Sequence, residues 1–260
     1  MKILNCSRQT LTELCSLIFA AQKVQPLCAE VGVLKGLNAS KLYEILKPKE
    51  LFLVDPWDAE TTTKIGDANF HRDWVIRESD SEFYYGGPLN EQTTFDNLYE
   101  EAKAKFVGLK NVNFIRKTSW EGLKELKSQR GPSSFDFVYL DGAHDFETVF
   151  DDLMSVRGLL NENSFLQLND CCYSEACLAQ NVGVLEAVGR FIKFSGFVPL
   201  AITNTDFSDL VLCPKNSVNL TLFSRLVENS DLSYVDVPDQ LLPAVSFKYN
   251  RSGNVCMSFC

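Results

Sequence analysis

The sequence predicts an α/β fold with a mostly parallel sheet, and three observations support this. Short apolar runs that suit buried strands alternate along the chain with patterns typical of amphipathic helices. A glycine-containing turn, Glu30-Val-Gly-Val-Leu-Lys-Gly36, joins an early strand to a helix. Three strands end in the acidic residues Asp55, Asp141 and Asp170. Because ligands of open α/β sheets bind outside the carboxyl ends of the strands, we expect these groups in one cleft.

The strands and helices alternate in order along the chain. Each predicted strand is a short apolar run, and together they span residues 27–33, 50–55, 112–115, 134–141, 164–170, 197–203 and 207–213. Each predicted helix has apolar residues at helical spacing, and together they span residues 11–24, 36–46, 91–109, 119–127, 146–160 and 178–194. Only Asn204-Thr205-Asp206 links the last two strands, so the last strand is expected to be antiparallel.

This pattern also suggests how the chain is divided. We predict an N-terminal helical segment at residues 1–25, a main domain at 26–214 and a C-terminal appendage at 215–260. Residues 57–90 form a long insertion without clear periodicity, which in a compact α/β unit is usually functional or disordered. Four of its aromatic residues suit either a lid over the cofactor, or an acceptor pocket, or a private hydrophobic cluster that holds the insertion to the body: Trp57, Trp74, Phe83 and Tyr84. His71 in the same segment either contacts substrate or is a solvated loop histidine, which is the favoured interpretation.

Composition restricts the class of partner. The formal net charge of −9 argues against a nucleic-acid partner, since phosphate binding needs a concentrated basic face. No apolar run is long enough to cross a bilayer, and the amino terminus lacks the pattern of a signal peptide. We therefore expect a cytoplasmic protein that acts on small molecules, with no membrane partner. The helix at 11–24 and the tail after Pro214 are candidate interfaces for a homo-oligomer.

The nine cysteines give a weak signal. Cys171, Cys172 and Cys177 are close enough in sequence to suggest a soft-metal site, but they lack a nearby histidine. Reduced, partly buried thiols are the favoured interpretation.

The turn from Glu30 to Gly36 is expected to hold a ligand. Gly32 and Gly36 allow a tight turn and a close approach of the backbone to a ligand. The spacing is E-x-G-x-x-x-G rather than the G-x-G-x-x-G that admits a dinucleotide pyrophosphate. A carboxylate before the first glycine suits a cationic or hydroxyl-rich ligand better than a diphosphate, which argues against a nicotinamide oxidoreductase.

With the glycine turn and the acidic strand ends in this order, residues 28–214 resemble the class I S-adenosylmethionine-dependent methyltransferases. The most specific piece is Phe135-Asp-Phe-Val-Tyr-Leu-Asp-Gly-Ala-His-Asp-Phe-Glu147. It is similar to the branch with a D-G-x-H motif after the fourth strand, which includes small-molecule and sugar O-methyltransferases, some of them metal-dependent. The resemblance implies a Rossmann-like, seven-stranded, mostly parallel sheet with an antiparallel last strand and helices on both faces.

The resemblance also implies a site for S-adenosylmethionine. Glu30 would lie near the methionine end, Asp55 would accept the ribose hydroxyls, and Asp141 would lie near the sulfonium. Ser119 would bind the adenine, while Trp120 either stacks on it or packs in the protein. The full set of implied cofactor-binding residues is Glu30, Gly32, Gly36, Asp55, Thr118, Ser119, Trp120 and Asp141.

Transfer to a hydroxyl needs a group that removes a proton or lowers a pKa. His144, beside Asp141, is the candidate catalytic base, and its alternative role is to cap the following helix. A Mg²⁺ ion held by Asp141, Asn169 and Asp170 is the second route, since these residues offer oxygen ligands. The resemblance implies such a set at these strand ends, although D-G-x-H relatives more often have His-Asp or Asp-Asp where this chain has Asn169-Asp170.

The leading hypothesis is therefore an S-adenosylmethionine-dependent methyltransferase that acts on a hydroxyl of a small molecule, with or without Mg²⁺. A metal-independent N-methyltransferase and a non-catalytic S-adenosylmethionine-binding regulatory protein are the alternatives.

Overall fold

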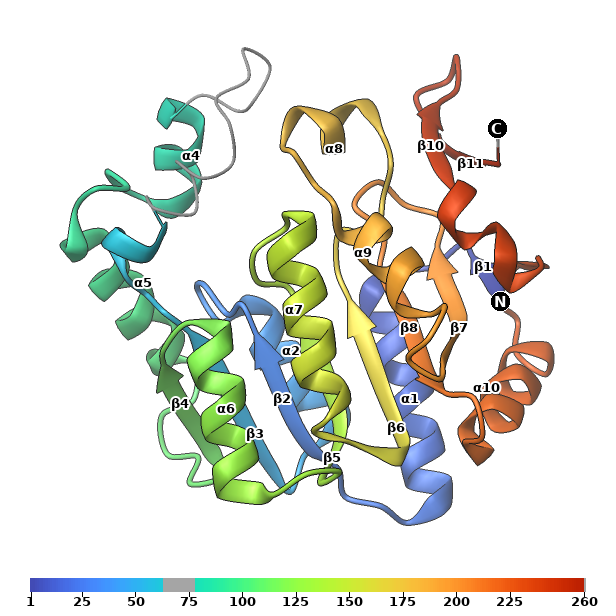
Figure 1. The fold of residues 1–260 in the computed structure, drawn as a ribbon, viewed down its shortest axis with the longest axis horizontal. Coiled ribbons are helices and arrows are strands. Elements are labelled where there is room, and N and C mark those ends of the chain that lie inside the picture. Colours follow the sequence, from blue (N-terminus) through green and yellow to red (C-terminus); the bar gives the residue numbers. More distant parts are fainter. Residues whose placement is uncertain (63–77, 260) are drawn as a thin grey trace.

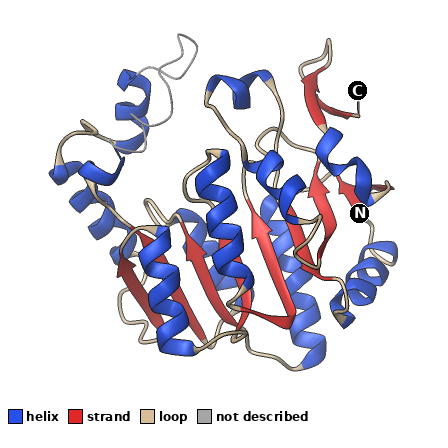
Figure 2. Ribbon diagram, viewed as in Figure 1, coloured by secondary structure: helices blue, strands red, loops and turns tan. Residues whose placement is uncertain are grey.

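The computed structural model describes residues 1–62 and 78–259, and its main feature is one central sheet (Figures 1 and 2). Within these residues the sheet has the order β4-β3-β2-β5-β6-β8-β7-β1-β9. Its strands are β1 (Lys2–Leu4), β2 (Leu27–Val31), β3 (Glu50–Asp55), β4 (Val112–Arg116), β5 (Phe135–Leu140), β6 (Leu160–Leu168), β7 (Phe197–Thr203), β8 (Leu210–Pro214) and β9 (Tyr234–Asp236). The strands are parallel except β8, which is antiparallel to β6 and β7, and β9, which is antiparallel to β1.

Helices cover both faces of the sheet and give it two hydrophobic cores (Figure 1). One core lies under α6 (Ser119–Arg130), α7 (Phe146–Arg157) and α9 (Val184–Phe191), which are in front in Figure 1. The other core lies under α1 (Arg8–Gln22), α2 (Leu37–Leu46), α5 (Gln92–Ala104) and α10 (Val218–Glu228). Strand residues alternate between the two, as the pleat requires: Phe52 and Val138 face the first core, whereas Leu53 and Phe137 face the second.

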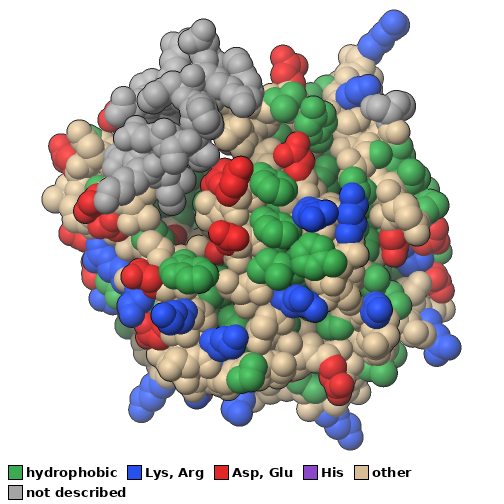
Figure 3. Space-filling model, in the orientation of Figure 1, with side chains coloured by type: hydrophobic (Ala, Val, Ile, Leu, Met, Phe, Trp, Pro, Cys, Tyr) green, Lys and Arg blue, Asp and Glu red, His purple; other side chains and the backbone are tan. Residues whose placement is uncertain are grey.

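The remaining elements lie around the rim. They are α4 (Glu78–Tyr85), α8 (Glu175–Ala179), a 3₁₀ helix η1 (Asp239–Ala244) and a two-stranded hairpin of β10 (Ser246–Tyr249) and β11 (Val255–Ser258). Figure 3 shows the face that carries α7 and α9, where hydrophobic side chains gather among Lys and Arg. The rings of Phe146, Phe150 and Phe194 are in contact there. Among the described residues, no helix is both long and apolar enough to cross a membrane.

The predicted fold class is confirmed, including the reversed strand after the short link at 204–206. The sheet extends beyond the predicted strands, because β1 pairs with β7 and β9 pairs with β1. The amino group of Met1 donates a 2.9 Å hydrogen bond to the carbonyl of Val237. The division into residues 1–25, 26–214 and 215–260 stays a prediction.

Several helix boundaries differ from the predicted ones, and two of these differences have a clear physical reason. The first helix begins at Arg8 rather than at residue 11, because Ser7 caps it by accepting a hydrogen bond from the Thr10 amide. The predicted helix at 178–194 is two helices, α8 and α9, separated by residues 180–183. Asn181 has a φ of +55°, which is not helical, and the Gly183 amide donates a 2.7 Å hydrogen bond to the His144 carbonyl rather than to a helical carbonyl.

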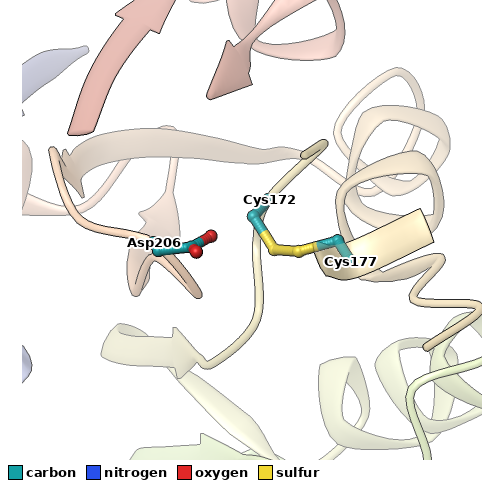
Figure 4. Close-up of side chains that lie close together, drawn as sticks. All are labelled: Cys172, Cys177 and Asp206. Carbon is teal, nitrogen blue, oxygen red and sulfur yellow. A yellow bond between two sulfur atoms is a disulfide. The ribbon is translucent and has the colours of Figure 1, made fainter. Parts of the chain in front are cut away.

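The cysteine prediction is wrong for one pair. Cys172 and Cys177 form a disulfide, and the Asp206 carboxylate lies beside it (Figure 4). The first turn of α8, in which the Ser174 hydroxyl accepts a hydrogen bond from the Cys177 amide, folds Cys177 back toward Cys172. A disulfide does not offer thiolates, so this pair does not supply the soft-metal ligands either. Cys171 is a free, buried cysteine, as predicted.

Candidate functional site

The turn after β2 forms one wall of the predicted cleft. Gly32 has a φ of +83°, and a Cβ there would lie 1.8 Å from the carbonyl oxygen of Asp141. Only glycine fits, because both the backbone conformation and the contact with the chain after β5 exclude a side chain. The amide of Asp141 also donates a 2.8 Å hydrogen bond to the Val31 carbonyl. The glycine turn and Asp141 are thus held against each other.

Gly36 lets the glycine turn pack closely against a helix. It has a φ of +70° as the N-cap of α2. A Cβ on Gly36 would lie 3.1 Å from the Cα of Ala102 on α5. The glycine therefore lets α5 approach the turn, and its predicted role at the cofactor stays a prediction.

Asp55, at the end of β3, binds the glycine turn directly. Its Oδ2 accepts hydrogen bonds from the amides of Val33 (2.9 Å) and Leu34 (3.0 Å), and its Oδ1 accepts one from the Trp57 amide (2.8 Å). A carboxylate has about four acceptor sites, so three are occupied by the backbone. Burial raises the pKa of Asp55, and these backbone hydrogen bonds act against that rise. The carboxylate shapes the turn, and its predicted binding of ribose hydroxyls stays a prediction.

Glu30, inside β2, keeps one carboxylate oxygen without a partner. The side chain is 1 % exposed, and Oε1 accepts a 3.0 Å hydrogen bond from the Asn38 amide nitrogen on α2. Oε2 is buried and has no hydrogen bond to any described residue. Burial raises the pKa of Glu30 well above its ordinary value, and Asp141 and Asp55 raise it further. An orphaned, buried acceptor of this kind suits a ligand that brings a donor.

Asp141, His144 and Asp170 form a compact cluster at the ends of β5 and β6. His144 Nε2 lies 3.2 Å from Asp141 Oδ1 and 3.3 Å from Asp170 Oδ2. Burial lowers the pKa of His144, but its hydrogen bond with Asp141 and the charges of Asp170 and Asp141 outweigh that effect and raise the pKa to about 9. Burial raises the pKa of Asp170 to about 6, partly offset by His144. In this structure the His144 imidazole thus bridges the carboxylates of Asp141 and Asp170.

Asn169 joins this cluster and completes the predicted oxygen set. Its amide nitrogen donates to Asp141 Oδ1 (3.3 Å) and to Asp170 Oδ1, while its own Oδ1 is buried with no partner among the described residues. Carboxylate and amide oxygens from these three residues match the preference of Mg²⁺. The donor set therefore fits a divalent cation, at the place where His144 now lies between the two carboxylates. The metal role itself stays a prediction.

The predicted adenine residues lie together at the start of α6. Thr118 caps the helix by accepting a 3.3 Å hydrogen bond from the Glu121 amide. Ser119 lies beside Asp152 of α7, which is 3 % exposed and has an Oδ2 without a partner among the described residues. Trp120 is 65 % exposed, so it is free to stack on a ligand and is not a core residue.

The insertion contributes a core residue and exposed aromatic residues. Trp57 is 1 % exposed, its ring packs on Tyr99 and Phe114, and its Nε1 donates to the Leu34 carbonyl at 2.8 Å. For Trp57 the hydrophobic-cluster alternative is therefore the observed one. The Tyr84 ring is 62 % exposed, and its backbone carbonyl accepts a 2.8 Å hydrogen bond from the Lys35 ammonium. Phe83 is almost fully exposed. The predictions for His71 and Trp74 fall outside the described residues.

A buried polar network below the cleft was not predicted. Asp209 on the segment before β8 is 1 % exposed, and its Oδ2 accepts 2.8 Å hydrogen bonds from the Tyr139 hydroxyl and the Gln167 amide. Arg8, the first residue of α1, forms an ion pair with Asp209 Oδ1 through Nε at 3.4 Å. Tyr139 and Gln167 lie two residues before Asp141 and Asn169, so strand periodicity was an available signal for them. Nothing local in sequence signals a pair as distant as Arg8 and Asp209.

Comparisons with known proteins agree with this geometry. A family model described as a methyltransferase domain matches residues 29–171, more than half of the 260 residues. No curated protein matches the chain in sequence. Among solved structures, the O-methyltransferase TomG from Streptomyces achromogenes, involved in tomaymycin synthesis and solved with SAM, is 13 % identical with a TM-score of 0.50, covering 81 % of this chain and 82 % of TomG. The cofactor-bound Rv0187 from MTB is 14 % identical with a TM-score of 0.50, covering 81 % of each chain.

These likenesses to solved structures show the same fold. The family match covers β2 to the end of β6, the part of the chain that carries the glycine turn, Asp55, Asp141, His144 and Asp170. The chain therefore belongs to the methyltransferase-domain family, and it is a methyltransferase.

Proposed function

We propose that this methyltransferase transfers the methyl group of S-adenosylmethionine to a hydroxyl of a small molecule. One observation carries the proposal: Asp141 connects the two halves of the site. Its carbonyl packs against Gly32 in the donor turn, and its carboxylate accepts a 3.2 Å hydrogen bond from His144. A residue that touches both the turn and the imidazole can align a methyl donor with an acceptor.

The acids of the cleft suit the charge of this donor. S-adenosylmethionine carries a positive sulfonium and a positive ammonium, and Glu30, Asp141 and Asp170 lie at the strand ends that would surround them. The fold neighbour TomG is an O-methyltransferase solved with SAM, which supports this donor and a hydroxyl acceptor. The D-G-x-H motif at Asp141 to His144 supports placement in the branch that includes small-molecule O-methyltransferases. The net charge of −9 favours a small acceptor over a nucleic acid.

The reaction is an in-line displacement. The acceptor oxygen attacks the methyl carbon, the carbon–sulfur bond breaks with its electron pair left on sulfur, and the hydroxyl proton leaves. The chain aligns the groups and excludes water. We assign the neutral form of His144 as the acceptor of the hydroxyl proton, since it is the one imidazole among the described residues and Asp141 and Asp170 orient it. Because these carboxylates raise the pKa of His144 to about 9, the neutral form becomes more abundant as the pH rises toward that value. A Mg²⁺ ion held by Asp141, Asn169 and Asp170 would lower the pKa of the acceptor hydroxyl when bound.

The donor is tested by calorimetry with S-adenosylmethionine, S-adenosylhomocysteine and NAD. We expect both sulfur ligands to bind and NAD not to bind. Binding of NAD alone would contradict the proposal.

The acceptor is tested with a metabolite library, in which we look for products heavier by one methyl group. A methylated hydroxyl supports the proposal, whereas a methylated amine as the sole product supports the N-methyltransferase alternative. Repeating the assay with a chelator and with Asp170→Ala tests the metal. Activity that is insensitive to the chelator would remove the metal and leave the donor site intact.

A further inference from the structure

Arg8 is a cationic side chain whose terminal guanidinium nitrogens have no hydrogen-bond partner among the described residues. Its side chain is 33 % exposed, and its ion pair with Asp209 is made through Nε at 3.4 Å. Within residues 1–62 and 78–259 no hydrogen bond to the Arg8 guanidinium is found. A guanidinium carries five N–H donors in a planar fork, so its terminal nitrogens are available to a ligand.

The buried network holds Arg8 in place from two sides. The Arg8 carbonyl accepts a 3.2 Å hydrogen bond from the Gln167 amide, and the same amide donates to Asp209 Oδ2 at 2.8 Å. Asp209 also accepts the Tyr139 hydroxyl at 2.8 Å. Both the backbone and the charged head of Arg8 are thus tied to β5 and β6, just before these strands reach the cleft.

The surroundings of Arg8 are acidic. Burial lowers the pKa of Arg8, but Tyr139, Asp209, Asp141 and Asp170 outweigh it and raise the pKa. The charge of Arg8 in turn acts to lower the pKa of Glu30. Glu30, Tyr139 and Gln167 are register partners on the adjacent strands β2, β5 and β6, so the network that holds Arg8 lies in the same row across the sheet as the Glu30 carboxylate. Most of the charge around Arg8 is negative, so a ligand with both positive and negative groups fits this end of the cleft best.

We propose that Arg8 binds the carboxylate of the amino-acid part of S-adenosylmethionine. The inference rests on the proposed function, because it concerns the same donor. The donor has a sulfonium, an ammonium and a single negative group, the carboxylate. The cleft acids serve the two positive groups, and a carboxylate among those acids needs a cation to be buried at all. The Arg8 fork matches a carboxylate with two parallel hydrogen bonds, while Nε stays on Asp209.

The test compares S-adenosylhomocysteine with its decarboxylated analogue, which lacks only the carboxylate. We expect the wild-type chain to bind S-adenosylhomocysteine at least about 10-fold more tightly, as hydrogen bonds to charged groups contribute roughly 1.5–3 kcal/mol. In Arg8→Gln this preference should disappear: affinity for S-adenosylhomocysteine falls at least about 10-fold, and affinity for the analogue changes less than about threefold. Arg8→Lys should retain part of the preference, because it keeps the charge without the fork.

The control variant is Arg157→Gln, which removes a positive charge from the exposed last turn of α7. It should leave the preference unchanged, which separates a direct contact from a change in net charge. Equal binding of the two ligands by the wild-type chain would overturn the inference, whether or not the variants fold. If Arg8→Gln still prefers S-adenosylhomocysteine over its decarboxylated analogue by the wild-type factor, the inference is also wrong. That result is the one expected if Arg8 instead contacts a carboxylate of the acceptor. If the wild-type chain binds neither ligand, the proposed function itself fails.

Discussion

The β2–β3 half of the cleft and the β5–β6 half use the same residue type, aspartate at a strand end, in opposite ways. Asp55 accepts hydrogen bonds from three backbone amides, at 2.8 to 3.0 Å. Asp141 accepts its side-chain hydrogen bonds from His144 and Asn169, and Asp170 is bonded to the same two side chains. Backbone partners move only if the turn refolds, whereas side-chain partners can rotate and be replaced by a ligand.

This difference gives the two halves of the cleft separate roles: one sets the shape of the site, and the other carries the groups that can react. In the β2–β3 half the carboxylate fixes the turn that forms the wall of the site. In the β5–β6 half the carboxylates hold an imidazole and an amide that a ligand can displace. Changes in the first half should therefore affect stability and donor binding, and changes in the second half should affect turnover.

The largest expected effect is on turnover, in His144→Ala. Loss of a positioned acid or base lowers rates by roughly 10²–10⁴-fold, so we expect kcat to fall by that factor. The affinity for S-adenosylhomocysteine should change less than about threefold, since this ligand lacks the methyl group and the acceptor. Steady-state kinetics and calorimetry on the same preparation measure both. His144→Gln is the matched control: if it keeps wild-type turnover, His144 only positions the acceptor by hydrogen bonding.

The next effect is on stability, and it compares the two glycines of the turn. Gly32→Ala places a Cβ 1.8 Å from the Asp141 carbonyl and also strains a positive φ, so we expect about 3 kcal/mol or more of destabilisation. Gly36→Ala meets Ala102 at 3.1 Å, which a small shift of α5 relieves, so we expect about 1–2 kcal/mol. Urea unfolding followed by circular dichroism gives both values. Equal losses would show that the contact between the turn and Asp141 is not tight.

Sequence patterns predicted the sheet well but not the partners of its polar residues. Strands β3 and β7 match the predicted ranges 50–55 and 197–203, because short buried runs bounded by a proline or glycine are unambiguous. Strand β1 and the edge strand β9 are only three residues long each and have no pattern of their own. Their pairing depends on the two chain ends meeting, which periodicity does not reveal.

The residues of the site were likewise predictable only in part. Acids at the ends of parallel strands were predictable, since topology brings those ends together and Asp141, His144, Asn169 and Asp170 do meet. Which hydrogen bonds each acid makes depends on the path of the chain after the strand, and this path turned Asp55 toward the backbone of the glycine turn. The disulfide between Cys172 and Cys177 likewise depends on the turn of α8.

The smallest effect on stability contrasts the two aspartates directly. In Asp55→Asn one oxygen still accepts the Val33 and Leu34 amides, but the new amide nitrogen faces the Trp57 amide, so one donor loses its partner. We expect a loss of about 1–2 kcal/mol in the free energy of unfolding and weaker donor binding. Asp170→Asn removes a charge whose burial is already unfavourable, so its unfolding free energy should fall by less than about 0.5 kcal/mol while turnover is lost. Urea unfolding of both variants beside the wild type measures the contrast. If Asp170→Asn is the less stable of the two, the carboxylates of the β5–β6 half are structural as well, and the division between shape and chemistry does not hold.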